Sequence, residues 1–382
     1  MVLKKILITY GTRPEAIKFA PLIHELNSRK DNFSVVICST AQHREMLDQV
    51  NTIFDLKPDI DLNLMKNGQD LTDITNGVLN GMRNVIKVIN PDLILVHGDT
   101  TTTLATSIAG FYNNVNVAHV EAGLRTYNIK EPFPEEFNRQ VVSKIAKWHF
   151  VPTIKSYENL IEEKISAETI LLTGNTVVDS LYWMLNKIDS NTNFKAGIEN
   201  KLVEILGFSI YSNKYILVTA HRRENFGEGI LEIIKSIKDL SKLYPNIHFV
   251  YPVHKNPNIL IPVEKLLSNI KNVHLIEPLS YEDLLLLLKN CYFVLTDSGG
   301  LQEEAPSLKK PVLVLRDVTE RPEAITGGTA RLVGANYDNI LKNCISLLDN
   351  ESEYNQMANN FNPFGDGTAS IQIADFIQKN LI

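Results

Sequence analysis

Short apolar runs rich in Val, Ile and Leu recur along the chain, and segments long enough for helices separate them. This alternation predicts β-strands joined by helical crossovers, the pattern of a parallel sheet covered on both faces. The runs form two series of similar size, so we expect an α/β chain with two doubly wound domains. The first series comprises Ile6–Tyr10, Val35–Ser39, Leu93–His97, Val115–Val120, Trp148–Val151 and Ile170–Leu172. The second comprises Tyr215–Thr219, Ile247–Tyr251, Val273–Ile276, Tyr292–Thr296, Val312–Leu315 and Ala330–Val333.

Polar and turn-forming stretches punctuate this pattern. Residues 189–193 (DSNTN) and 211–214 (YSNK) lie between the two series, and residues 362–367 (NPFGDG) form a second break. Apolar residues after that break have the spacing of an imperfect amphipathic helix. The length of 382 residues also favours two domains. Ligands of open α/β sheets bind beyond the carboxyl ends of the strands, so the cleft between the two domains is the expected site.

Composition excludes several classes of protein. A net charge of −6 argues against a surface that wraps nucleic acid, so basic residues must act locally in pockets. The N-terminal apolar run is too short for a signal peptide, and the leucine block Leu284–Leu288 is far below membrane-spanning length. Cys38, Cys291 and Cys344 lie far apart, which predicts neither a disulfide framework nor a zinc site. We expect a cytoplasmic protein.

Side chains capable of catalysis and anion binding follow strand after strand. In the first half these segments are residues 11–18 (GTRPEAIK), 97–103 (HGDTTTT), 121–125 (EAGLR) and 132–139 (PFPEEFNR). In the second half they are residues 221–224 (HRRE), 252–254 (PVH), 297–304 (DSGGLQEE) and 316–321 (RDVTER). The carboxyl ends of parallel strands lie at one edge of a sheet, so each set is expected at its domain's ligand-binding edge.

Individually, most of these residues have a structural alternative. Asp99 has the position of a helix N-cap, and Glu135 that of a first-turn acid that complements a helix dipole. The structural alternative for His221 is a buried core histidine. For His254, the sequence favours a structural hydrogen bond and a phosphate contact equally. Glu121 is different, because it directly follows a hydrophobic strand and precedes Ala-Gly. We expect its carboxylate to point into the cleft.

The glycine pair after the strand at 292–296 indicates a phosphate site with hydroxyls nearby. Gly299 and Gly300 allow close approach of backbone N–H groups, while Glu303 and Glu304 would repel a bare phosphate. The sequence has no G-x-G-x-x-G motif, so we expect no nicotinamide cofactor, and no H-E-x-x-H motif, so we expect no protein metal site. It also lacks the G-x-S-x-G motif of a serine nucleophile. A basic pocket in one domain facing carboxylates in the other is the chemistry of a sugar-nucleotide enzyme.

Several long motifs resemble the bacterial non-hydrolysing UDP-N-acetylglucosamine 2-epimerases. They are YGTRPEAIKFAPL, AQHREMLDQV, VHGDTTTTLA, HVEAGLRT, PFPEEFNR, TGNTVVDSL, AHRREN, YPVHKNPN, LTDSGGLQEEAPSL, RDVTERPE and NPFGDGTAS. The resemblance runs from about Lys5 to the final helix. It implies a GT-B architecture, with Rossmann-like domains at 1–174 plus 365–382 and at 175–364, the C-terminal helix returning to the first. It also implies a homodimer that interconverts UDP-GlcNAc and UDP-ManNAc without a cofactor.

The resemblance also assigns site residues. The family's acid/base positions fall on Asp99, Glu121, Glu135 and His221, without saying which is the base. Its substrate-binding positions correspond to Arg13, Lys18, Arg222, His254, Leu279, Tyr281, Ser298, Gly299, Gly300, Glu304 and Arg321. Among these, the Ser298–Gly300 turn is expected to hold the diphosphate and Glu304 the ribose hydroxyls, with the uracil near Leu279 and Tyr281.

The family further implies regulation by a second UDP-GlcNAc. The matching positions are Gln42, Glu45, Gly68, Glu135, Arg222 and His254; some members carry other residues at positions 45 and 68. The implied reaction eliminates UDP to a bound 2-acetamidoglucal and re-adds it, and it supplies ManNAc units for cell-surface polysaccharide. Rival hypotheses are a hydrolysing epimerase, an epimerase for a more decorated nucleotide, a GT-B glycosyltransferase and a non-catalytic sugar-nucleotide sensor.

Overall fold

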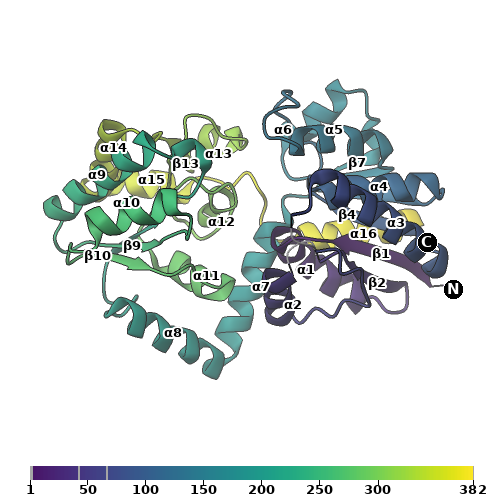
Figure 1. Ribbon diagram of the computed structural model, residues 1–382, viewed down its shortest axis with the longest axis horizontal. Helices are drawn as coiled ribbons and strands as arrows, with labels where there is room; N and C mark the ends of the chain where they lie inside the picture. Colours follow the sequence, from purple (N-terminus) through teal and green to yellow (C-terminus); the bar gives the residue numbers. More distant parts are fainter. Residues whose placement is uncertain (1–2, 42–43, 66–67, 382) are drawn as a thin grey trace. The chain divides into compact units, whose positions relative to one another are not determined.

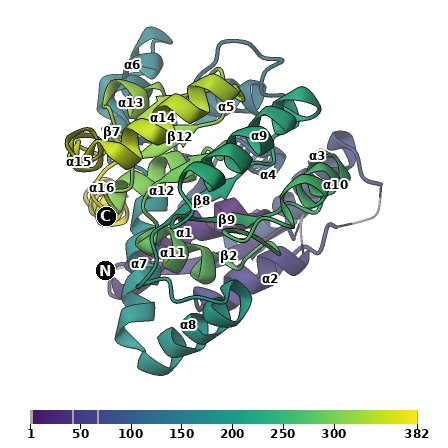
Figure 2. The ribbon, with the colours of Figure 1, turned by 90° about the vertical axis from the view of Figure 1, so that its left-hand side faces the viewer.

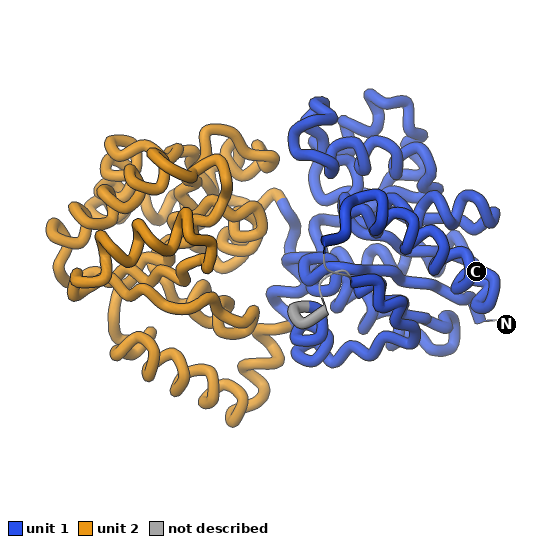
Figure 3. The backbone as a smooth tube through the Cα atoms, viewed as in Figure 1, with its two compact units in different colours: residues 1–183, 364–382 blue, residues 184–363 orange. Residues whose placement is uncertain are grey.

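The computed structural model describes residues 3–41, 44–65 and 68–381. The chain divides into two compact units, coloured separately in Figure 3: unit 1 is residues 1–183 and 364–382, and unit 2 is residues 184–363. The observed division at 183/184 falls within helix α7 (Thr176–Ser190), and the expected one at 174/175 falls just before that helix. Each unit is an α/β fold with a parallel sheet, which confirms the predicted fold class.

Unit 1 contains a parallel sheet whose strand order is β3-β2-β1-β4-β5-β6-β7. Its strands are β1 (Lys4–Tyr10), β2 (Phe33–Ser39), β3 (Ile60–Asp61), β4 (Leu93–His97), β5 (Asn116–Val120), β6 (Trp148–Val151) and β7 (Ile170–Leu172). The central strands are almost fully buried apolar runs, as expected where helices cover both faces. The order reverses between β1 and β4, so the carboxyl ends of these two strands flank a topological switch point.

Helices cover both faces of this sheet (Figure 1). The apolar sides of α3, α4 and α5 pack together with one face, and α1 lies beside α2 and α16 on the other. The Phe376 ring of α16 meets the rings of Trp148 and Phe150 edge-on, with both centroid distances 5.6 Å, so the chain's last helix is packed into unit 1. The helices are α1 (Arg13–Ser28), α2 (Arg44–Ile53), α3 (Leu71–Ile89), α4 (Thr101–Tyr112), α5 (Glu135–Ile145), α6 (Ile154–Glu162), the 3₁₀ turn η1 (Ala167–Thr169) and α16 (Ala369–Leu381).

Unit 2 repeats the same topology in a second parallel sheet, ordered β10-β9-β8-β11-β12-β13. Its strands are β8 (Tyr215–Thr219), β9 (His248–Pro252), β10 (Val273–Ile276), β11 (Val294–Thr296), β12 (Val312–Val314) and β13 (Ala330–Leu332). Here the order reverses between β8 and β11, so this pair flanks the second switch point.

Helix α9 lies between α10 and α14 in unit 2, and their buried residues form one hydrophobic core with the sheet (Figure 2). Helix α8 contacts α11 and β10. The helices are α8 (Thr192–Leu206), the 3₁₀ turn η2 (Arg223–Asn225), α9 (Glu228–Leu243), α10 (Pro257–Leu267), α11 (Tyr281–Asn290), α12 (Leu301–Ser307), α13 (Pro322–Thr326), α14 (Tyr337–Asp349) and α15 (Glu351–Asn359). Within the described residues, no helix is both long enough and apolar enough to span a bilayer.

Candidate active site

Glu121 follows β5 directly and lies in a buried polar cluster of unit 1. Its backbone adopts a left-handed conformation with φ of 61°, and the residue is only 8% exposed. One carboxylate oxygen, Oε2, forms an ion pair with Lys18 Nζ and accepts a hydrogen bond of 3.1 Å from Asn175 Nδ2. Holding a non-glycine residue in this conformation costs about 1–3 kcal/mol of free energy, and residues in such conformations are found mainly at functional sites. Glu121 is thus fixed at the carboxyl end of β5 by side chains of α1 and of the segment before α7.

His97 borders the same carboxylate from the end of β4. Its Nε2 lies 3.8 Å from Glu121 Oε2 and 3.3 Å from Thr176 Oγ1, and the ring is 2% exposed. Burial lowers the pKa of His97 to about 3, although the neighbouring carboxylate opposes this shift. His97 is therefore neutral near pH 7, and the cation paired with Glu121 is Lys18.

Glu15, which the sequence analysis did not single out, ties together the two loops at the switch point of unit 1. Its Oε2 accepts from the backbone N–H of Gly11 at 3.1 Å and of Thr12 at 2.8 Å, and its Oε1 accepts from Thr100 Oγ1 at 2.7 Å. Burial raises the pKa of Glu15, and these hydrogen bonds oppose the rise. The Thr12-x-x-Glu15 spacing of a capping box is the sequence signal that identifies this residue.

Gly11 is required for the close approach of these loops. A Cβ at this position would lie 2.2 Å from Thr40 Oγ1 and 2.6 Å from Thr102 Oγ1. Arg13 and Lys18 both project from the helix that starts after this turn, Arg13 at its first position and half-buried. The β1–α1 turn is thus packed for close contact rather than being an ordinary solvent-exposed turn.

Asp99 and the two acids that begin α5 have separate environments. Asp99 Oδ2 accepts from Arg139 Nε at 2.9 Å, and its backbone carbonyl accepts from Asn138 Nδ2. The N-cap of α4 is Thr100 rather than Asp99, so the structural alternative for Asp99 is wrong. Glu136 is fully buried and accepts from the backbone N–H groups of residues 126 and 127, whereas Glu135 is half-buried. Glu136 anchors a loop, which leaves Glu135 as the more accessible acid of the pair.

In unit 2, the Ser298–Gly300 turn lies at the end of β11. Ser298 N–H donates to Thr296 Oγ1 at 2.9 Å, and the Arg321 guanidinium packs directly against Gly299, where a Cβ would lie 2.7 Å from Nη1. Arg321 Nε in turn donates to the buried Glu303 at 2.5 Å. A side chain at 299 would therefore displace the Arg321 guanidinium, which lies directly beside this turn.

Glu304 and Tyr281, predicted separately, are joined in the structure. Tyr281 Oη donates to Glu304 Oε1 at 2.8 Å, and the two residues are 5% and 6% exposed. Leu279 lies two residues before Tyr281 and is half-buried. The pair links the start of α11 to α12, so the segment predicted for uracil and the acid predicted for ribose are neighbours.

His221, Arg222 and His254 also lie together, around a buried acid that the sequence analysis did not assign. Asp297 Oδ2 accepts from the backbone N–H groups of His221 and Arg222, both at 2.8 Å. The rings of His221 and His254 stack with centroids 5.9 Å apart. Asp297 is absent from the predicted residues because nothing in its spacing distinguishes it from an ordinary strand-end aspartate.

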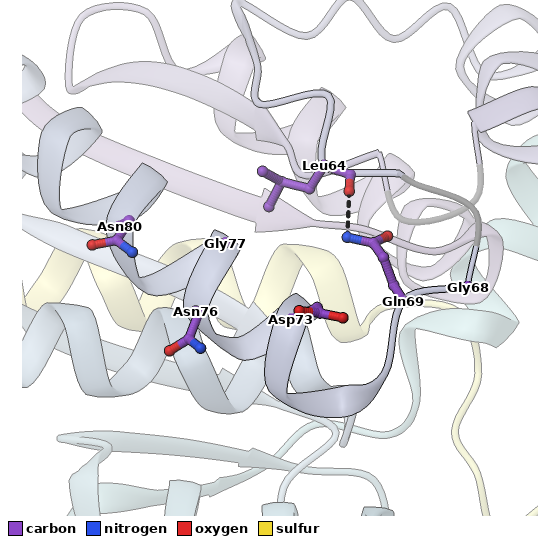
Figure 4. A pocket seen from close by; sticks show the side chains of 7 residues that line it. All are labelled: Leu64, Gly68, Gln69, Asp73, Asn76, Gly77 and Asn80. Atoms are coloured by element: carbon purple, nitrogen blue, oxygen red, sulfur yellow. Dashed lines mark hydrogen bonds between the residues drawn. The ribbon is translucent and has the colours of Figure 1, made fainter.

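The predicted regulatory residues are only partly described. Gln42 lies outside the described residues, as does the side chain of Glu45. Gly68 lines a pocket of about 320 Å³ with Leu64, Gln69, Asp73 and residues of α3, as Figure 4 shows. In this pocket Gln69 Nε2 donates to the Leu64 carbonyl at 2.7 Å. The described residues contain no group of three or more His, Cys, Asp or Glu side chains placed to hold a metal ion.

A family model and individual relatives match nearly the whole chain, and they agree on one protein family. The model of the UDP-N-acetylglucosamine 2-epimerase family matches residues 24–378. A UDP-N-acetylglucosamine 2-epimerase from Campylobacter jejuni is 52% identical over 99% of this chain and 98% of its own length. One from Escherichia coli K12 is 48% identical over 99% of both chains.

Solved structures extend the similarity to the fold. The UDP-GlcNAc 2-epimerase of Neisseria meningitidis, bound to UDP-GlcNAc, has a TM-score of 0.91 at 49% identity, covering 98% of this chain and all of that one. The enzyme of Methanocaldococcus jannaschii, in complex with UDP-GlcNAc and UDP, has a TM-score of 0.82 at 32% identity, with 98% and 100% coverage. The chain belongs to the UDP-N-acetylglucosamine 2-epimerase family.

Proposed function

We propose that this protein is a non-hydrolysing UDP-N-acetylglucosamine 2-epimerase that interconverts UDP-GlcNAc and UDP-ManNAc. The observation that carries the proposal is the Glu121 cluster: a buried carboxylate at a strand end, in a strained backbone conformation, paired with Lys18 and Asn175. The solved relative from N. meningitidis holds UDP-GlcNAc, which supports the choice of substrate.

The chemistry requires carboxylates because the C2 proton of an N-acetylhexosamine is barely acidic. Cleavage of the C1–O bond sends its electron pair to UDP and builds positive charge at C1, while a base removes the C2 proton. The product is a bound 2-acetamidoglucal with a C1–C2 double bond. A proton then arrives at C2 from the opposite face, and UDP re-adds at C1. Carboxylates both stabilise the cationic character at C1 and transfer the protons.

Unit 1 supplies three of the four candidate proton-transfer groups in this proposal, and unit 2 supplies the fourth, His221. Glu121 is the leading candidate for one face of the sugar, since Lys18 and Asn175 hold its carboxylate in place. Inversion needs a second group on the other face, and Asp99, Glu135 and His221 are the candidates. The side chain of Asp99 is held by Arg139, so its carboxylate is also fixed rather than solvated.

Unit 2 supplies the nucleotide-binding groups. We assign the diphosphate to Ser298, Gly299 and Gly300, with Arg321 beside the turn. Arg222 and His254 complete the basic set, and Arg13 of unit 1 is assigned to the nucleotide as well. Arg222 Nε is buried, and no described group accepts a hydrogen bond from it, so this N–H is available to donate to a phosphate oxygen. Glu304, oriented by Tyr281, is assigned to the ribose, with Leu279 near the uracil.

Regulation by a second UDP-GlcNAc is a separate part of the proposal. It would use Gln42, Glu45, Gly68, Glu135, Arg222 and His254. If it operates, UDP-ManNAc alone is turned over slowly until UDP-GlcNAc accumulates or is added. A full initial rate with UDP-ManNAc alone contradicts this part and leaves the epimerase reaction standing.

We also propose a homodimer in the cytoplasm that supplies ManNAc units for cell-surface polysaccharide. Val88, Phe111 and Tyr112, at the ends of the neighbouring helices α3 and α4, are 81%, 62% and 74% exposed, which suits contact with a second copy. A cytoplasmic site suits a charged nucleotide sugar, which does not cross a bilayer unaided. Light scattering on the purified protein measures the oligomeric state, and a monomer mass contradicts the dimer.

Proton NMR with UDP-GlcNAc in D₂O tests the function. We expect UDP-ManNAc to appear, with deuterium at C2 of both epimers. Release of free UDP and ManNAc would instead identify a hydrolysing enzyme. Binding without any change in the spectrum would contradict epimerisation of this substrate and favour a different nucleotide or a sensor.

A further inference from the structure

Asp297 is buried at the switch point of unit 2, where β11 ends beside β8. It is 0% exposed and touches the residues that follow β8. Its Oδ2 accepts from the backbone N–H groups of His221 and Arg222 at 2.8 Å and from Asn225 Nδ2 at 3.0 Å. That oxygen is fully occupied by fixed N–H donors.

The other carboxylate oxygen faces the imidazole of His221. Oδ1 lies 3.1 Å from His221 Nδ1, and it accepts no well-aligned hydrogen bond from any described group. A buried acceptor without a donor costs about 1–3 kcal/mol. A small rotation of the ring would align an Nδ1–H with this oxygen, so the environment favours a proton on Nδ1.

Resting on the proposed function of His221 in proton transfer, we propose that Asp297 is a positioning residue that fixes the His221 tautomer. With Nδ1 protonated, the lone pair of the neutral ring is on Nε2, at the other side of the ring. The His221 side chain is 39% exposed, and its stacking on His254 restricts the ring plane. Nε2 is then the atom that accepts or returns a proton, and the Asp297 carboxylate stabilises the imidazolium that forms.

The electrostatic environment of Asp297 agrees with this role. Burial alone would raise its pKa, but the contact with His221 and the backbone N–H groups outweigh burial, so its pKa lies below the usual range. The carboxylate is therefore charged at neutral pH. The contact of Thr219 Oγ1 with Thr296 Oγ1 at 2.5 Å and the pairing of β8 with β11 hold the two strand ends together without Asp297.

Asp297→Asn tests the tautomer. In this variant, the asparagine Oδ1 keeps the three N–H donors, so its NH₂ group faces His221 Nδ1. Nδ1 must then accept a hydrogen bond from that NH₂ group, and the ring proton moves to Nε2. Imidazole ¹⁵N NMR of the full-length, ligand-free protein distinguishes the tautomers, with a His221→Gln variant assigning the signal. We expect Nδ1–H in the wild type, Nε2–H in Asp297→Asn, and kcat lowered roughly 10²-fold or more at nearly unchanged KM.

Asn225→Ala is the matched control, because it removes a donor to Oδ2 and leaves the Oδ1–Nδ1 contact in place. It should lower stability while retaining the wild-type tautomer. An Nε2–H ring in the wild type overturns the proposal, even if Asp297→Asn does not fold. An unchanged tautomer in a folded Asp297→Asn also overturns it. The tautomer is read without substrate, so this test stands apart from any failure of the epimerase assay.

Discussion

Six strands of unit 1 have the same order as the six strands of unit 2, and in each unit a buried acid joins the loops at the switch point, but the two acids have different roles. Glu15 in unit 1 accepts hydrogen bonds from backbone N–H groups and threonine hydroxyls. Asp297 in unit 2 accepts from backbone N–H groups on one oxygen and faces an imidazole with the other. Both carboxylates join the loop after the first strand of their unit to the neighbouring loop.

This difference shows how one topology serves two purposes. The partners of Glu15 among the described residues are neutral donors, so its carboxylate holds the loops of unit 1 in place. Asp297 has a titratable partner, so the same kind of connection can also set which atom of His221 carries a proton. Replacing Glu15 should therefore lower the stability of unit 1, whereas replacing Asp297 should lower the rate of catalysis.

Glu121→Gln should have the largest effect and separates proton transfer at Glu121 from nucleotide binding. The amide cannot accept the C2 proton, so we expect turnover to fall about 10²–10⁴-fold. UDP affinity, assigned to unit 2, should stay within a few-fold of the wild type by calorimetry. Turnover like the wild type would remove Glu121 from the mechanism, and equal losses of binding and turnover would contradict a role of Glu121 in proton transfer alone.

Glu15→Gln tests the structural half of the comparison. The glutamine NH₂ would face N–H or hydroxyl donors, leaving buried groups unpaired, so we expect the free energy of unfolding to fall by roughly 3 kcal/mol. Hydrogen exchange should increase first in the β1–α1 and β4–α4 loops of unit 1. Glu25→Gln, which alters a partly exposed pair with Arg29, is the control and should change little. An equal effect of both substitutions would show that Glu15 does not connect the loops.

A third prediction concerns the acid sensitivity of unit 1. Burial lowers the pKa of His119 to about 3, although its hydrogen bond to the Gly98 carbonyl opposes the shift. Below about pH 6.5 the unfolded chain binds a proton at His119 that the folded chain takes up only near pH 3. Stability should therefore fall as the pH falls through this window, by about 1.4 kcal/mol per pH unit for this residue.

His119→Gln removes this contribution, so its unfolding free energy should depend less steeply on pH between 6 and 4 (roughly the middle of that window). Denaturant unfolding at several pH values measures the slope. Identical slopes in the two proteins would mean that His119 is protonated in the folded state within that window.

The smallest effect is expected at the surface of unit 2. The ion pair of Lys255 with Glu277 spans 2.9 Å between side chains that are 74% and 80% exposed. Solvent and salt screen such a pair, so Lys255→Ala should change the unfolding free energy by less than about 0.5 kcal/mol. A loss comparable with that of Glu15→Gln would contradict the ranking of buried over exposed contacts.

Much of the fold could be predicted from the sequence because buried parallel strands are continuous apolar runs. Every predicted run coincides with a strand, while β3 was missed because two residues give no periodic signal. The site was harder. Glu121 could be singled out by its position after a strand, yet its left-handed backbone and its pairing with Lys18 depend on contacts between residues 103 positions apart.

Glu15 and Asp297 show why the remainder could not be predicted. Glu15 has the spacing of a capping box and Asp297 lies at a strand end, but the connecting role of each depends on donors from a distant loop, 85 residues away for Thr100 and 76 for His221. Periodicity reports burial along one element and carries no information on such pairings.

Cleavage of the C1–O bond is the central claim of the proposed mechanism, and positional isotope exchange tests it most directly. UDP-GlcNAc carrying ¹⁸O in the bridge between C1 and the β-phosphorus would be incubated with the wild-type protein and followed by ³¹P NMR. Elimination frees the β-phosphate to rotate before re-addition, so we predict that label appears in its non-bridging positions. Label that stays entirely in the bridge while UDP-ManNAc accumulates would contradict the elimination.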